Sequence, residues 1–368
     1  MSETGEDLGV RKARHLEICI ANDHYAVEGG TTGFEGLRFL HRSIPDLDAE
    51  HVSTATEFLG IPVRAPLLIS SMTGGSAEAY RANQDLARAA ELMGLPVGMG
   101  SIRILFRKPE VFEHFQLKKL APSVPVMANI GAVQLRDGDD GQLIELIKRL
   151  EVDGLAIHLN PGQELFQHDG DRDFRNVLAS IARFAGQSPV PVIVKETGCG
   201  IAPSDMKRLF ESGAAYVNVA GSGGTNWMSV EKYRLDQDDP LYSDSFTDWG
   251  NPTAITLSAA RHILPSDIMS RVIASGGLRT GVDLAKAIAL GASLGGFALP
   301  LIRAVARGGV EAVQMTLEQI LTEFRTAMVL AGAENLEALR RCRLLETMAF
   351  RHEVGEMIQA DAPGTDQT

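Results

Sequence analysis

The order of apolar segments constrains the fold of this chain more than any other feature. From Pro66 onward, short β-rich apolar runs alternate with longer segments of helical periodicity, a pattern typical of βα units around a parallel sheet. We expect eight strands, at residues 66–71, 96–100, 125–130, 154–159, 191–196, 215–220, 271–276 and 294–299. Eight parallel strands are what a closed (β/α)8 barrel, the TIM-barrel architecture of the α/β class, requires.

The rest of the chain is predicted to attach to this barrel. Segments such as 77–94, 141–150 and 281–291 repeat apolar side chains at helical spacing between the strands. A polar and aromatic insertion, residues 228–252, follows the sixth strand, and loops of that length are usually lids or binding loops. The predicted parts are an N-terminal extension folded onto the barrel (1–65), the barrel (66–308), C-terminal helices (309–360) and a tail (361–368).

A doubly wound open sheet is the alternative architecture, because it shows the same alternation of strands and helices. A dinucleotide-binding fold of that kind opens with a glycine-rich fingerprint after its first strand. Here the first strand is followed by SMTGGS (71–76), and glycine-bearing turns follow most later strands as well. The sequence therefore favours the barrel, whose functional residues lie at the carboxyl ends of the strands.

Composition excludes several classes of protein. The formal net charge of −12 argues against non-specific binding to nucleic acid or to an anionic membrane. Cys19, Cys199 and Cys342 are too few and too scattered for a disulfide framework or a zinc site. The N-terminus lacks the apolar run of a secretory signal, and no window reaches the length of a membrane span. We expect a cytoplasmic protein that binds neither nucleic acid nor membrane.

The turns after the seventh and eighth strands have the composition of a phosphate site. They read SGGLRTG (275–281) and ALPLIRA (298–304). In barrels these two turns commonly bind phosphate through backbone N–H groups and a helix N-terminus. Arg279 would add a bidentate contact. The alternative is that Gly276 and Gly277 only form a tight turn.

Other strand ends supply groups suited to a ring system. Lys195 ends the otherwise apolar fifth strand, where an unpaired lysine is costly to bury, so we expect it to face an aldehyde or an anionic ring. Pairing with Glu196 is the alternative. Groups that suit a heteroaromatic cofactor end other strands, at Asn129, Ser71, Met72 and Thr73. Thr225 lies in a glycine-rich turn after the sixth strand that could approach a phosphate. With the phosphate site, these groups predict a binding site for flavin mononucleotide (FMN).

Nine motifs, in register along the chain, resemble those of the type 2 isopentenyl-diphosphate isomerases. They are RKARH (11–15), SMTGG (71–75), MGSIR (99–103), ANIGA (128–132), HLNPGQE (158–164), VKE (194–196), AGSGGTNW (220–227), GGLRTG (276–281) and ALPLIR (298–303). The resemblance implies an FMN-dependent isomerase that interconverts isopentenyl diphosphate and dimethylallyl diphosphate in isoprenoid biosynthesis, with no net redox change. It also implies reduced FMN, Mg²⁺, NADPH or another reductant to prime the flavin, and a homo-oligomer, tetramer or octamer.

The resemblance assigns roles to particular residues. FMN would be bound by Ser71, Met72, Thr73, Ser101, Asn129, Lys195, Thr225, Gly277, Leu278, Arg279, Ala298 and Leu299. The substrate would be bound by Arg11, Lys12, Ser101, Ile102, Arg103 and Gln163. Glu164 would hold magnesium, an ion that typically keeps waters and shares one or two carboxylates with substrate phosphates.

Proton transfer is the chemical problem of this reaction. An isolated alkene is a poor base and its allylic C–H a very poor acid, so no ordinary side chain matches both transfers by pKa. Our hypothesis makes reduced FMN the principal acid and base, with Gln163 and His158 as assisting catalytic groups. For His158, the alternative is a core histidine that is hydrogen-bonded at a strand end.

Several charged residues also have simpler interpretations. Taken alone, Arg11 and Lys12 indicate a solvated basic pair near the N-terminus, and only the resemblance makes them substrate ligands. Glu231, early in the insertion, is expected to be a surface carboxylate, the alternative being a group that organises metal or substrate. The aspartates within residues 169–173 are expected to form a solvated acidic turn.

Three other functions fit parts of the pattern. A 2-hydroxy-acid oxidase resembles this chain in its FMN loops but places a histidine base after the sixth strand, where this chain has AGSGGTNW. A dehydrogenase of the inosine-monophosphate type would need a loop cysteine, and none lies between Gly221 and Asn251. A non-catalytic flavin-binding barrel would bind FMN without turnover.

Overall fold

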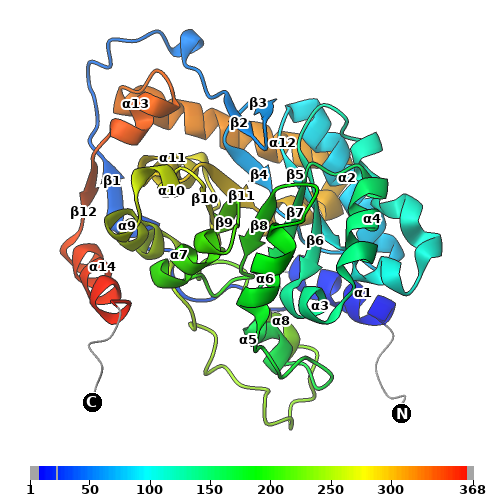
Figure 1. Ribbon diagram of the computed structural model, residues 1–368. Coiled ribbons are helices and arrows are strands. Elements are labelled where there is room, and N and C mark those ends of the chain that lie inside the picture. The colour runs from blue at the N-terminus through cyan, green and yellow to red at the C-terminus, as the bar shows by residue number, and fades with distance from the viewer. Residues whose placement is uncertain (1–7, 22–23, 363–368) are drawn as a thin grey trace.

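Eight parallel strands close into a barrel at the centre of the molecule (Figure 1). The computed structural model describes residues 8–21 and 24–362. The strands are β4 (Leu67–Ile69), β5 (Val97–Ser101), β6 (Val126–Gly131), β7 (Gly154–His158), β8 (Val192–Lys195), β9 (Tyr216–Asn218), β10 (Val272–Ser275) and β11 (Leu294–Phe297). Each pairs with the next in the chain, and β11 pairs with β4, so the predicted (β/α)8 barrel is confirmed.

Apolar side chains fill the amino end of the barrel. Leu68, Met127, Ile193, Ile273 and Leu294 point inward from the barrel strands and form one buried cluster. A hairpin of the N-terminal extension, β2 (Thr56–Phe58) and β3 (Ile61–Val63), adds Phe58 to this cluster. Polar side chains are therefore left to the carboxyl ends of the strands.

The helices surround the barrel, as the periodicity predicts. They include α2 (Ala77–Met93), α3 (Ala132–Asp137), α4 (Asp140–Leu150), α6 (Val177–Ala185), α7 (Pro203–Glu211), α9 (Thr253–Ile263), α10 (Ser266–Met269) and α11 (Gly281–Ala289). Helix α12 (Leu299–Ala331) runs from the eighth strand into the C-terminal region, with non-helical backbone at Gly308 and Gly309. This break lies where the sequence predicts the end of the barrel.

The two ends of the chain are joined by a small sheet. Strand β1 (Leu37–Phe39) of the N-terminal extension pairs antiparallel with β12 (Leu344–Glu346), between α13 (Leu336–Arg341) and α14 (Met348–Ala360). Helix α14 packs against α9 of the barrel. The extension and the C-terminal helices are thus fixed to the barrel and to each other.

Three short segments gather at the carboxyl ends of the strands (Figure 1). Helix α1 (Leu8–Ile20) comes from the N-terminal extension, α5 (Pro161–Leu165) follows β7, and α8 (Trp227–Lys232) begins the insertion. Helix α8 contacts both α1 and α5. None of the helices in the described part of the chain is long and apolar enough to cross a membrane.

Candidate active site

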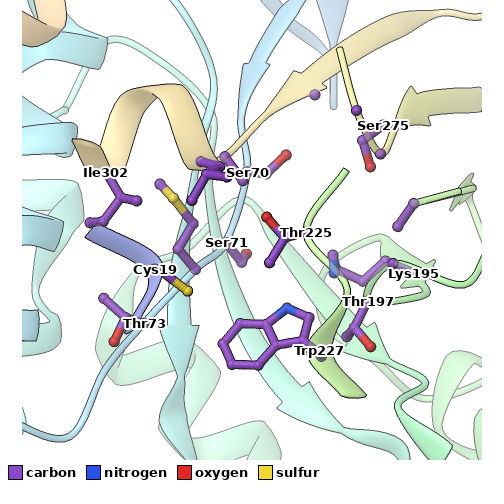
Figure 2. Close-up of a pocket in the computed structure, with 18 of the residues that line it drawn as sticks. Cys19, Ser70, Ser71, Thr73, Lys195, Thr197, Thr225, Trp227, Ser275 and Ile302 are labelled. Carbon is purple, nitrogen blue, oxygen red and sulfur yellow. The ribbon is translucent and has the colours of Figure 1, made fainter. Parts of the chain in front are cut away.

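A pocket opens at the carboxyl ends of the strands, where most of the predicted FMN ligands converge (Figure 2). We call it the strand-end pocket. Its lining includes, from the barrel, Ser70, Ser71, Met72, Thr73, Lys195, Thr225, Gly277, Arg279, Ala298 and Leu299, and from α1, His15, Leu16 and Cys19. Of the other predicted FMN ligands, Ser101, Asn129 and Leu278 lie outside this lining. Leu278 buries its side chain in the core, so only its backbone faces this region.

The turns after β9 and β10 approach so closely that only glycine fits between them. A Cβ on Gly224 would lie 2.3 Å from the backbone nitrogen of Gly277, and Gly277 has a φ of +75°. Within the described residues, the backbone N–H groups of Gly277 and Leu278 donate no hydrogen bond. These N–H groups, with the start of α12 at Leu299 and the Arg279 guanidinium, form a cradle that fits a phosphate.

The remaining wall of the strand-end pocket fits a flavin ring. Lys195 is 9% exposed and directs its nitrogen into the pocket (Figure 2). Burial lowers the pKa of Lys195 to about 8, although the charge of Glu196 acts in the opposite direction. Ser70 Oγ and Thr73 Oγ1 are buried without a partner among the described residues, which marks hydrogen bonds that a ligand would supply.

A second pocket adjoins the first and is lined by cations. We call it the cationic pocket, and its lining includes Arg11, Lys12, His15, Ser101, Arg103, His158, Asn160, Gln163, Glu164 and Gln167. His15 is common to both pockets. Burial and the neighbouring Arg11 lower the pKa of Lys12 to about 8, and burial and Arg107 lower that of Arg103. Such a concentration of positive charge is typical of an anion site. Ile102, the other predicted substrate ligand, is fully buried and lies outside this lining.

Arg11 and Lys12 do not form the solvated pair that their local sequence indicates. The Arg11 side chain is 12% exposed, and its Nη1 donates to Gln167 Oε1 at 3.0 Å and to Asp169 Oδ2 at 3.0 Å. Lys12 packs its stem toward Gly75, after β4. Helix α1 of the same chain therefore covers the site. Asp169 is solvated, as expected, with its side chain 55% exposed, and it also pairs with Arg11.

His158 is a neutral hydrogen-bonding group in this structure. Its Nδ1 lies 2.6 Å from Asn129 Oδ1, which can only accept, so Nδ1 carries the proton and Nε2 keeps a lone pair. Burial and the charge of Lys195 lower the pKa of His158 to about 3. His158 is therefore both the hydrogen-bonded strand-end histidine and a member of the cationic pocket, where Nε2 can accept a hydrogen bond but has no proton to donate.

Glu164 is held at the start of α5. Pro161 occupies the first turn of this helix, and Asn160 Nδ2 donates to Glu164 Oε1 at 2.8 Å. The second carboxylate oxygen accepts the backbone N–H of Asp171 at 3.0 Å. Across residues 8–21 and 24–362, no group of three or more His, Cys, Asp or Glu side chains is placed to hold a metal ion. A cation here would take one carboxylate from the protein and its other ligands from water and substrate, which suits Mg²⁺.

Glu231 is not the surface carboxylate that the sequence suggests: it is 0% exposed. Its Oε1 accepts hydrogen bonds from Gln163 Nε2 at 2.9 Å and Gln167 Nε2 at 2.6 Å, and His15 Nε2 lies 2.9 Å away. Arg234 pairs with the other oxygen. Burial alone would raise the pKa of Glu231, but His15, Arg234 and Gln163 outweigh it and lower the pKa to about 2.

Sequence reasoning also assigned no role to Trp227. Trp227 lines the strand-end pocket, and its ring meets that of His15 edge to face at 5.3 Å. Trp227 and Glu231 are four residues apart on α8, so they share one face of this helix. That spacing, directly after a glycine-rich turn, is the signal from which both could have been found.

Comparison with known proteins assigns the class. The sequence profile of the FMN-dependent dehydrogenases matches residues 18–105 and 158–346. Among solved structures, a lactate oxidase from Pediococcus acidilactici superposes with a TM-score of 0.67 at 19% identity, over 94% of this chain and 96% of that one. A mandelate oxidase superposes at 0.62 and 18%, over 90% and 99%. The chain is a member of the FMN-dependent barrel family, and its likeness to the oxidases is one of fold.

Relatives of higher sequence identity identify the family within this class. The isopentenyl-diphosphate delta-isomerase of Borrelia garinii subsp. bavariensis is 39% identical over 94% of this chain and 95% of its own length. That of Paracoccus zeaxanthinifaciens is 42% identical over 90% and 95%, and that of Thermococcus kodakarensis 39% over 92% and 91%. This chain belongs to the isopentenyl-diphosphate delta-isomerase family.

Proposed function

We propose that this chain interconverts isopentenyl diphosphate and dimethylallyl diphosphate, with FMN in the strand-end pocket and the diphosphate in the cationic pocket. One observation carries the proposal: the two pockets meet at His15, so a small substrate anchored by its diphosphate extends toward the flavin ring. The reaction is part of isoprenoid biosynthesis and has no net redox change.

The residues of the strand-end pocket divide the binding of FMN between them. The turn at Gly277–Arg279 and the start of α12 hold the phosphate, and Lys195 faces the ring. Bound and reduced, FMN supplies an electron-rich ring face and a ring nitrogen that exchanges a proton. NADPH is the proposed reductant for this state.

The cationic pocket anchors the substrate. Arg11, Lys12 and Arg103 contact the diphosphate, and Ser101 and the Ile102 backbone complete its site. Glu164 contributes one oxygen to a Mg²⁺ ion that the diphosphate shares. The hydrocarbon tail offers only apolar contact, so these charges supply most of the substrate affinity.

Gln163 acts beside the reacting carbons, and Glu231 positions it from behind the pocket wall. Gln163 donates through Nε2 to Glu231 Oε1, which fixes the amide and leaves its Oε1 toward Asn160 Nδ2, 3.3 Å away. Glu231 is an anion at neutral pH, so it accepts hydrogen bonds and has no proton to supply. His158 likewise presents a lone pair at Nε2. The protein thus offers oriented acceptors, while helix α1 and the insertion exclude water.

The function is tested by anaerobic incubation of the FMN-loaded protein with isopentenyl diphosphate, Mg²⁺ and NADPH. Dimethylallyl diphosphate is the expected product, identified by mass and chromatography. Reconstitution with 5-deaza-FMN, which lacks the proton-exchanging nitrogen, should abolish turnover. Absence of product with native FMN would falsify the proposed activity and leave a flavin-binding barrel.

Replacing Glu164 by glutamine should weaken the response to magnesium. Glutamine keeps the size of the side chain but loses the charge that the cation needs, so the Mg²⁺ concentration for half-maximal rate should rise at least about tenfold. FMN affinity should stay unchanged, because Glu164 does not line the strand-end pocket. Asp173→Asn, in the next loop and paired with Arg175, is the control and should behave as wild type. Loss of FMN with an unchanged Mg²⁺ response would remove Glu164 from the metal site.

Substrate capture should weaken in alkaline solution. Lys12 has a pKa of about 8 in the free protein, so it is a cation below that pH and loses its charge above it. With FMN saturating, kcat/KM should therefore fall above about pH 8, since this ratio reports groups of the free enzyme. Lys12→Arg keeps its charge to much higher pH. The decline should move upward in this variant, and identical profiles would show that Lys12 does not control capture.

We further propose a homo-oligomer, tetramer or octamer, in the cytoplasm. Light scattering after size exclusion measures the assembly.

A further inference from the structure

Glu196 is a buried carboxylate that no step above uses. It is 5% exposed and follows Lys195 at the end of β8. Its Oε2 accepts three consecutive backbone N–H groups, from Gly198 at 2.5 Å, Cys199 at 2.5 Å and Gly200 at 3.1 Å. Three donors converging on one oxygen form an anion nest and favour the charged carboxylate. Burial still raises the pKa of Glu196 above its usual value, and the backbone N–H groups and Lys195 oppose that rise.

The turn that Glu196 holds is part of the wall of the strand-end pocket. Thr197 and Gly198 line this pocket. Gly198 has a φ of +143°, and a Cβ there would lie 2.3 Å from the carbonyl oxygen of Thr225. The turn therefore rests directly on the glycine-rich turn after β9, which carries a predicted FMN ligand. A shift of the first turn would displace the second.

Glu196 is also the nearest counter-charge of Lys195. Among the described residues that line the strand-end pocket there is no Asp or Glu. Lys195 Nζ donates to the backbone oxygen of Glu196 at 2.6 Å, and the charge of Glu196 raises the pKa of Lys195 against the effect of burial. The acid is thus placed outside the pocket, where it supports the charge of Lys195 without repelling an electron-rich ring.

The other titratable groups near Lys195 do not replace this support. His15 and Cys19 face it from α1, Arg279 from the turn after β10, and His158 from β7. Burial lowers the pKa of His15 and raises that of the Cys19 thiol to about 12, so neither supplies negative charge at neutral pH. Arg279 is paired with Glu28 of the extension.

We propose that Glu196 is a positioning residue for the cofactor: it fixes the turn 197–200 against the FMN-binding turn after β9, and it keeps Lys195 a cation facing the flavin ring. The inference rests on the proposed FMN site. It predicts two separable effects, one on the shape of the pocket and one on its charge.

The test is titration of the flavin-free protein with FMN, followed by flavin fluorescence, between pH 6 and 9.5. Wild-type affinity should fall above about pH 8 as Lys195 loses its proton. Glu196→Gln should bind FMN at least about tenfold more weakly, because a charge-assisted contact is lost. The FMN affinity of Glu196→Gln should also begin to fall at a lower pH than that of the wild type. The midpoint potential of the FMN bound to this variant should be lower, since less positive charge faces the reduced ring.

Two further variants separate charge from shape. Lys195→Gln should remove the pH dependence, and adding Glu196→Gln to it should weaken binding without restoring that dependence. Glu196→Asp keeps the charge but has a shorter side chain, so it should bind FMN weakly with the wild-type pH profile. This variant also tests the inference if Glu196→Gln does not fold. Wild-type affinity and profile in Glu196→Gln, or a shifted profile in Glu196→Asp, would overturn the inference. Failure of the wild type to bind FMN would instead overturn the proposed function.

Discussion

Replacing Glu231 by glutamine is expected to lower kcat by about 10²-fold, the usual effect of misplacing a group that lies beside the reacting atoms. The carboxylate is fully buried and accepts from both Gln163 and Gln167. A neutral amide has the same shape, but it loses the charge that faces His15 and Arg234 and turns an N–H₂ group toward other donors. Gln163 would no longer be oriented beside the substrate.

Single-turnover and steady-state rates with FMN-loaded protein measure this effect. The flavin content and KM of Glu231→Gln should stay close to wild type, because Glu231 lines neither pocket. Asp244→Asn, in the same insertion, is the control and should keep full activity, because the Asp244 side chain is 85% exposed. A kcat within about threefold of wild type, with FMN retained, would remove Glu231 from the reaction.

Replacing both Arg11 and Lys12 by alanine is expected to raise KM for isopentenyl diphosphate by about 10²-fold or more. Loss of one partner in a buried charged contact costs about 2–5 kcal/mol, and each 1.4 kcal/mol is tenfold in affinity. In the double variant, Arg103 would be the main remaining cation of the cationic pocket to contact the substrate diphosphate. FMN should stay bound, because neither residue lines the strand-end pocket.

The control for this pair lies on the same helix. Arg14→Ala removes a cation of α1 whose side chain is 38% exposed and pairs with Glu17. Its KM should stay within about twofold of wild type, since exposed ion pairs contribute little. Equal effects of Arg14→Ala and of the double variant on KM would mean that α1 attracts the substrate only through its total positive charge, not through contacts of Arg11 and Lys12. An unchanged KM in the double variant would place the diphosphate elsewhere.

The barrel follows from the sequence because its signals are local. Each strand is buried on both faces and therefore appears as a short apolar run, and each helix shows its own periodicity. The glycines at 276 and 277 mark a turn that only glycine fits, so the phosphate cradle could also be placed from the sequence. The carboxyl ends of barrel strands meet at one face, so Lys195 and Thr225 can be predicted to share a pocket even when their contacts are unknown.

Two parts of the site could not be placed in this way. Local sequence makes Arg11 and Lys12 a solvated pair and Glu231 a surface acid, whereas the structure covers the pocket with α1 and buries Glu231 beneath it. The ion pair of Arg11 spans 158 residues, and the hydrogen bond between Gln163 and Glu231 spans 68. No periodicity reports a contact across such separations.

The sequence by itself therefore determined the barrel, the strand ends that line the strand-end pocket and, through its motifs, the family. Only the tertiary structure decided the surroundings of the buried charged side chains. Glu231 lies beside His15, Lys12 beside Arg11, and Glu196 against the turn that follows Lys195. The physical reason is that strand and helix formation depend on neighbouring residues, whereas burial and pKa depend on whatever distant segment packs against a side chain.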